Sequence, residues 1–137
     1  MSNLVIARFV DGRLVKGTSV DVDPAKPACH VRSTDGTTTE VKLAELKALF
    51  FVRDLRGDPS YKEGARPDPA DVRLRGGRTI RLTFRDGEVL AGITHHFPPT
   101  RPFFFVLPMD PKSNNIRALV NRAAVAEVAP GPAPPAG

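Results

Sequence analysis

The chain has little cysteine and histidine and no long apolar run, and these shortages exclude several classes of protein. Cys29 is the only cysteine among 137 residues, so an internal disulfide framework is impossible and a reducing cytoplasm is the expected compartment. No apolar stretch reaches the roughly 18–20 residues that a membrane-spanning helix needs. The opening MSNLVIARFVDGRL lacks the regions of a secretory signal, so we expect a soluble, cytoplasmic protein without membrane contact.

Few side chains could ligate a metal. Besides Cys29, the nitrogen and sulfur ligands are limited to His30, His95 and His96. His95 and His96 are adjacent, and adjacent strand residues point to opposite faces, so the two cannot easily share an ion. The aspartates fall in predicted turns, where backbone hydrogen bonding explains them. We therefore predict no metal, no cofactor and no catalytic residue, which means a protein that is not an enzyme.

An internal repeat is present. FVDGRLVKG at residues 9–17 returns as FRDGEVLAG at residues 84–92, an offset of 75 residues. Further pairs at this offset are Val31 with Val106, Val41 with Ile116 and Lys42 with Arg117, and a one-residue shift then pairs Leu49 with Val125 and Val52 with Val128. Self-similarity of this kind predicts the duplication of one structural unit.

Each copy is predicted to form five short strands. Ile80, Leu82 and Phe84 alternate with polar residues, which is the period of a strand with one buried face. The Asp-Gly pairs at 11–12 and 86–87 predict tight turns. Gly17 and Gly92 lie inside the following strands, where a missing side chain permits a sharp bend or a close approach of two backbones. The remaining strands are predicted at 28–33, 39–43 and 48–52 in the first copy, and at 103–108, 115–120 and 125–128 in the second.

These elements predict an all-β protein made of two tandem, small, strongly bent five-stranded antiparallel barrels. The first barrel would span residues 1–53 and the second 78–129. Residues 54–77 are rich in proline, glycine and charge and read as a linker, and the Pro/Ala/Gly-rich end, residues 130–137, reads as a disordered tail. Whether the copies form two barrels or one merged sheet stays open.

The pattern TIRLTFRDGEVLAGI, FFFVLP and NIRALVNRAAVAEVAP resembles the Sm-like barrel, with the layout of the bacterial Hfq-type RNA chaperones, and other SH3-like barrels share its bend and final strand. The resemblance covers residues 78–130 and, through the repeat, 4–53. It implies a fold layout. The Lys-His pair by which the Hfq type binds RNA is not matched, because Asn121-Arg122 stands there in one copy and Glu45-Leu46-Lys47 in the other.

Two apolar rows are expected on the outward faces of the strands. Val5, Ala7 and Phe9 are predicted to point inward, which leaves Leu4 and Ile6 on the other face. The second row is Phe103, Phe105 and Leu107. Apolar rows of this kind are costly to leave in water. We predict that they form a protein interface, between the two copies or between subunits, unless a neighbouring loop covers them.

The positive charge is concentrated in the middle of the chain. The net charge is +5, and residues 53–85 alone hold nine Lys/Arg against five Asp/Glu. The candidate nucleic-acid-binding residues are Arg73, Arg75, Arg78, Arg81 and Arg85.

A third pattern lies in the linker. Arg53 and Arg56, followed by Asp58, Ser60 and Gly64, come near the cyclic-di-GMP-binding PilZ pattern, which the spacing misses by one residue at each part.

The predicted function, taken from the apolar rows, is a non-catalytic binding module for a protein partner or for self-association. RNA or single-stranded nucleic-acid binding is the alternative, and PilZ-like binding is a lesser one.

Overall fold

The structure is a computed structural model that describes residues 3–62, 64, 67–96 and 100–131. Of the tail predicted at residues 130–137, Pro130 ends a strand, and residues 132–137 lie outside the described residues. The first half holds β1 (Asn3–Phe9), β2 (Leu14–Ser19), β3 (Ala28–Arg32), β4 (Thr38–Lys42), the 3-10 turn η1 (Leu43–Glu45) and β5 (Leu46–Val52). The second holds η2 (Val72–Leu74), β6 (Arg78–Phe84), β7 (Val89–Thr94), β8 (Phe103–Pro108), β9 (Asn115–Asn121), η3 (Arg122–Ala124) and β10 (Val125–Pro130). The prediction of an all-β fold is confirmed.

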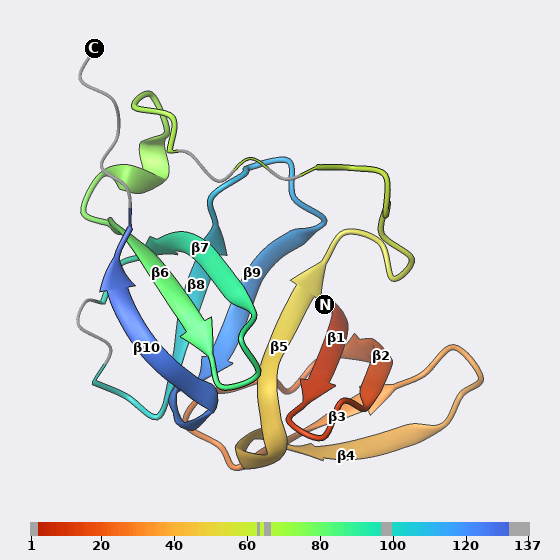
Figure 1. The fold of residues 1–137 in the computed structure, drawn as a ribbon. Coiled ribbons are helices and arrows are strands. Elements are labelled where there is room, and N and C mark those ends of the chain that lie inside the picture. The colour runs from red at the N-terminus through yellow and green to blue at the C-terminus, as the bar shows by residue number, and fades with distance from the viewer. Residues whose placement is uncertain (1–2, 63, 65–66, 97–99, 132–137) are drawn as a thin grey trace.

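The strands form one antiparallel sheet, in the order β10-β6-β7-β8-β9-β5-β1-β2-β3-β4. Each half has the same internal order, with its fifth strand beside its first, and β5 lies between β1 and β9 (Figure 1). The strand pairing therefore shows one merged, open sheet and not the two tandem five-stranded barrels predicted from the sequence, which left the merged sheet as the open alternative. The reason is that β5 has two edges, and β9 satisfies the backbone groups of the edge that a lone unit would leave unpaired.

The two halves also share their strand register, with one correction to the sequence alignment. Cys29 pairs with Val41, and its counterpart 75 residues later, Phe104, pairs with Val120. Val41 therefore corresponds to Val120, an offset of 79, and the predicted match of Val41 with Ile116 is wrong, as are those that follow it. The cause is a longer turn between β8 and β9, which inserts four residues where sequence alone sees no gap.

A β-bulge repeats at the same place in both halves. Opposite β1, Leu46 and Ala48 pair with consecutive residues, so Lys47 is the extra residue of β5. Opposite β6, Val125 and Glu127 do the same, and Ala126 is the extra residue of β10. Lys47 and Ala126 are 79 residues apart, which agrees with the corrected offset. A bulge at the same place in both halves is expected if both descend from one ancestral unit, because bulges are kept within families.

The repeated glycines act as predicted. A Cβ atom on Gly17 would lie 2.0 Å from the carbonyl oxygen of Arg32, and one on Gly92 would lie 2.4 Å from that of Leu107. The backbones of the second and third strands therefore touch at both bends. In the Asp-Gly turns, Gly12 and Gly87 have φ of 94° and 93°, a conformation that favours glycine.

The core consists of two clusters, one in each half, and β5 contributes to both. Its residues Leu46, Leu49 and Phe51 belong to the first-half core, whereas Ala48, Phe50 and Val52 belong to the second-half core. All seven residues of β5 are buried. Because the same strand completes both cores, the halves are joined by packing as well as by backbone hydrogen bonds.

Candidate functional site

A cleft of about 330 Å³ opens where the two halves meet, beside η1 and η3. Its walls are Val10, Ala44, Lys47, Phe84, Arg85, Asp86, Asn121, Ala123 and Ala124. Ala44 and Ala123 occupy equivalent positions in the two 3-10 turns, at the offset of 79. Their short side chains leave room between the turns, so carbon atoms line most of the cleft. We call it the junction cleft.

Asn121 ties the two turns together. Its side-chain amide donates hydrogen bonds to the carbonyl oxygens of Ala44 (3.3 Å) and Leu46 (2.9 Å), and its oxygen accepts one from the backbone N–H of Ala123 (3.0 Å). Asn121 is buried, and a buried amide is stable only when its donors and acceptors are paired. The first-half residue at this position is Lys42, whose side chain makes no corresponding cap hydrogen bond to η1.

Lys47, the bulge residue of β5, fastens the Asp-Gly turn of the second half to the first. Its ammonium group donates to Asp86 Oδ2 and Glu88 Oε1, both at 2.8 Å, and lies 4.8 Å from the centre of the Phe84 ring. Lys47 holds the pKa of Asp86 below its usual value, and the Glu88 N–H acts in the same direction. The equivalent Asp11 instead bonds to Arg13 of its own turn.

The polar groups of the junction cleft are thus occupied by one another, and Arg85 follows the same pattern by donating from Nε to the Ala123 carbonyl at 2.7 Å. Among the described residues, every buried side-chain nitrogen or oxygen has a hydrogen-bond partner. The cleft therefore offers an apolar floor with a rim of both charges, which suits an apolar side chain of a ligand better than a charged group.

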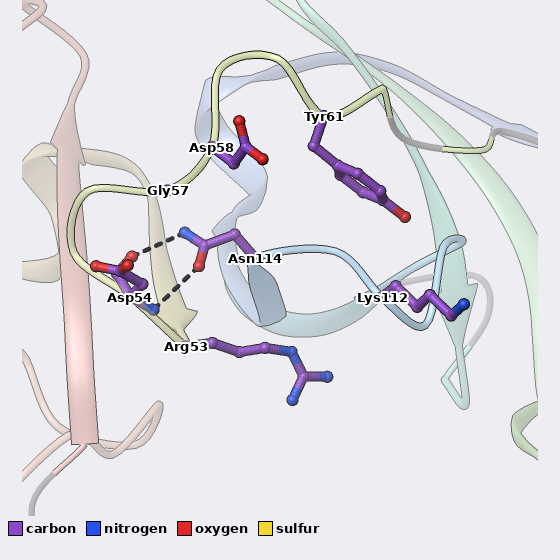
Figure 2. A pocket seen from close by; sticks show the side chains of 7 residues that line it. All are labelled: Arg53, Asp54, Gly57, Asp58, Tyr61, Lys112 and Asn114. Carbon is purple, nitrogen blue, oxygen red and sulfur yellow. Dashed lines mark hydrogen bonds between the residues drawn. The ribbon is translucent and has the colours of Figure 1, made fainter.

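A second hollow, also about 330 Å³, lies beside the segment that follows β5 (Figure 2). Its lining residues are Arg53, Asp54, Gly57, Asp58, Tyr61, Lys112 and Asn114. Asn114 fixes the segment, because its amide donates to the Asp54 carbonyl and accepts from the Asp54 N–H, as the dashed lines in Figure 2 mark.

The PilZ-like residues lie in this region, but each makes its own local hydrogen bonds and they do not converge on one point. The Arg53 guanidinium donates to the carbonyls of Ser113 and Pro111, both at 3.2 Å. Asp58 accepts from the N–H and hydroxyl of Ser60, and the Gly64 N–H donates to Asp110. Two donors of Arg53 are therefore already used, where a phosphate clamp needs the whole fork.

The five arginines of the predicted nucleic-acid strip occupy different environments. Arg73 is half-buried, and its guanidinium bonds to Asp71 and to the carbonyls of Pro108 (2.8 Å) and Met109 (2.9 Å). This arginine holds the η2 segment on the sheet, and it also keeps the pKa of Asp71 below its usual value. Arg75, Arg78, Arg81 and Arg85 are exposed.

The two apolar rows pack inside the chain. Leu4 and Ile6 lie against the second-half core, and Phe103 and Phe105 lie against the first-half core, where Phe105 is 6.2 Å from Phe51 between ring centres. Leu107 is half-buried and pairs with Ile93. Of the alternatives left open by the sequence, packing between the two copies accounts for four of these five residues.

The histidines and the cysteine do not meet. His30 bonds to Asp21, His95 Nε2 lies 3.1 Å from the Arg73 carbonyl, and burial raises the pKa of Cys29 to about 11. Within the described ranges, no group of three or more His, Cys, Asp or Glu residues could hold a metal ion. No helix of the described part of the chain is long and apolar enough to cross a membrane.

Sequence reasoning missed the two residues that build the junction cleft. Lys47 is the one charged residue in the otherwise apolar LKALFFV of β5, and Asn121 ends the apolar run of β9. A lone polar residue in a run that is buried on both faces is a signal for a specific partner. That partner, however, lies far away in the sequence.

The fold and this site define an all-β protein with an internal duplication and a ligand-sized cleft between its halves. The chain belongs to a family of unknown function, DUF6982, whose model matches residues 1–130. Comparison with curated proteins and with solved structures found no match.

Proposed function

We propose that this chain is a non-catalytic binding module, descended from a duplicated Sm-like or SH3-like barrel, that holds an apolar side chain of a protein partner in the junction cleft. The observation that carries the proposal is the composition of the cleft. Its floor is carbon from both halves, Lys47 pairs with Asp86, and Arg85 donates to the Ala123 carbonyl. Ligand sites are commonly concave, mainly apolar and placed where two structural units meet.

The cleft is suited to recognition because its shape is held rigidly. Asn121 and Lys47 each bond across the junction, so neither wall moves without breaking buried or half-buried hydrogen bonds. A preformed cleft saves the conformational entropy that a flexible site loses on binding. The exposed Val10, which is 64% accessible, extends the apolar surface at the mouth.

Filling the cleft tests the proposal. Ala44→Phe and Ala123→Phe each place a ring in the cleft from an exposed position, and Ala25→Phe makes the same change at an exposed turn elsewhere. Peptides selected from a displayed library on the wild-type protein should bind both filled variants at least about tenfold more weakly, a loss of about 1.4 kcal/mol. The Ala25→Phe protein should bind normally. Equal binding to all the proteins would refute the site.

Nucleic-acid binding remains the second candidate, because Arg81 and Arg85 are exposed on and beside one strand, β6. Arg81→Ala combined with Arg85→Ala should then reduce the dependence of binding to a single-stranded oligonucleotide on salt, since each neutralised phosphate contributes to that slope. Lys26→Ala is the control for charge alone. An unchanged salt slope in the double variant would remove this candidate.

A further inference from the structure

One surface of the second half is covered by the chain's own linker, whereas the equivalent surface of the first half is open. In the second half, the η2 segment lies over the end of β7 and β8, because Arg73 bonds to the carbonyls of Pro108 and Met109. Met109 is consequently buried, and Gly77 approaches Ile93 so closely that a Cβ atom would lie 2.9 Å from its Cγ2. The chain thus covers this part of the second half with its own linker.

The corresponding surface of the first half is open. At the offset of 75, Met109 corresponds to Thr34 and Ala91 corresponds to Lys16. Thr34 and Lys16 line a hollow of about 650 Å³ between the β1–β2 face and the segment after β5. The described part of the chain places no segment over it comparable with η2.

The hollow carries excess positive charge. Lys16, Arg53 and Arg56 line it, against the single carboxylate of Asp54, while Leu4 and Leu55 supply apolar surface. Lys16 Nζ makes one hydrogen bond, to the Leu55 carbonyl at 3.2 Å, and an ammonium group has three donors.

Asp54 is already engaged in the loop itself. Its Oδ1 accepts from the Arg56 N–H at 2.9 Å. Arg53 donates to two carbonyls on its other side, so it contributes mainly charge, and Lys16 and Arg56 are the residues that remain able to contact a ligand directly.

We propose that this hollow binds a small phosphate-bearing molecule of nucleotide size. Lys16 and Arg56 would contact the phosphate from opposite walls, one from β2 and one from the segment after β5. The hydroxyl of Thr34 supplies a further polar group, and Leu4 and Leu55 accept the less polar part of the ligand. This site is separate from the junction cleft and shares no residue with it.

The experiment is a titration of the full chain with AMP and with inorganic phosphate, followed by amide chemical shifts and by calorimetry. Lys16→Ala gives the first half the residue that the second half carries at this position. Lys16→Ala and Arg56→Ala should each weaken AMP binding about tenfold, because a hydrogen bond to a charged group contributes about 1.5–3 kcal/mol. Lys26→Ala, which removes an exposed lysine of a distant turn, should bind AMP as the wild type does. Melting temperatures should be unchanged in all three, since all three side chains are exposed.

Each other outcome overturns the proposal. Equal weakening by Lys26→Ala would mean attraction by net charge alone. Absence of shifts at the amides around Lys16 and Arg56 would mean that the hollow binds neither AMP nor phosphate. A single-stranded oligonucleotide serves as the other source of phosphate. If it binds and only the Arg81→Ala, Arg85→Ala protein loses it, while AMP does not bind, the phosphate site lies on β6.

Discussion

Replacing Phe50 by alanine should destabilise both halves of the protein together. Phe50 is 7% exposed, belongs to the second-half core and is covered on its outer side by the Arg8 guanidinium, 5.5 Å from the ring centre. Its equivalent in β10 is Ala129, so the variant copies a residue that the repeat already uses. Truncation of a buried phenylalanine costs about 3–5 kcal/mol, and we take about 3 because the Arg8 side chain over the ring allows some collapse. For a chain of this size that corresponds to a fall in melting temperature of about 10 °C.

The informative assay is hydrogen exchange resolved by residue, alongside urea unfolding. Since β5 completes both cores, amides of β2 and β3 in the first half should lose protection by the same free energy as amides of β7 in the second. Val20→Ala, at a position that is 77% exposed, should change the free energy of unfolding measured in urea by less than about 0.5 kcal/mol. If the first half kept its protection while the second half opened, the claim that the junction makes one cooperative unit would be refuted.

Two further predictions follow from the first half. Gly17→Ala should cost about 3 kcal/mol in urea unfolding, because its Cβ would meet a backbone oxygen at 2.0 Å, whereas a cost below about 1 kcal/mol would show that the bend relaxes freely. The second concerns pH. The His30 N–H and ring lower the pKa of Asp21 to about 2, and the same contact raises the pKa of His30 above its usual value. The Asp21 contribution is therefore present above its unfolded pKa of about 3.9 and is lost as the pH falls toward 2. The contribution of charged His30 is present below about pH 6.5 and is lost as the pH rises through its raised value. Asp21→Asn should consequently destabilise the protein most between about pH 4 and 6, and a stability difference independent of pH would contradict the pairing.

The strands were predictable from local pattern, and their assembly was not. Alternation in β6, the two Asp-Gly turns and the paired glycines all report on neighbours a few residues away, so sequence alone located them. The junction depends on contacts such as Lys47 with Asp86 and Asn121 with Leu46, which span 39 and 75 residues. The apolar run at residues 48–52 of β5 is the one local feature that indicates burial of both faces of this strand.

The positions of the polar and apolar residues show how the two duplicated units differ at their surfaces. At the junction, the outward residues of β1 are Leu4 and Ile6, whereas their equivalents in β6 are Thr79 and Arg81. In the same way, Phe103 and Phe105 of β8 stand where β3 has the small Ala28 and the polar His30. The outer strands of the sheet, β4 and β10, carry the exposed Glu40 and Glu127, and β10 ends at Pro130. Charged residues and proline discourage pairing with another strand at an open edge. Each surface is thus apolar where it packs against the other half of the same chain, which is always present at a high effective concentration. The equivalent surface is more polar where it would meet other molecules. This asymmetry follows if duplication turned one contact between two repeats into a permanent contact within a single chain.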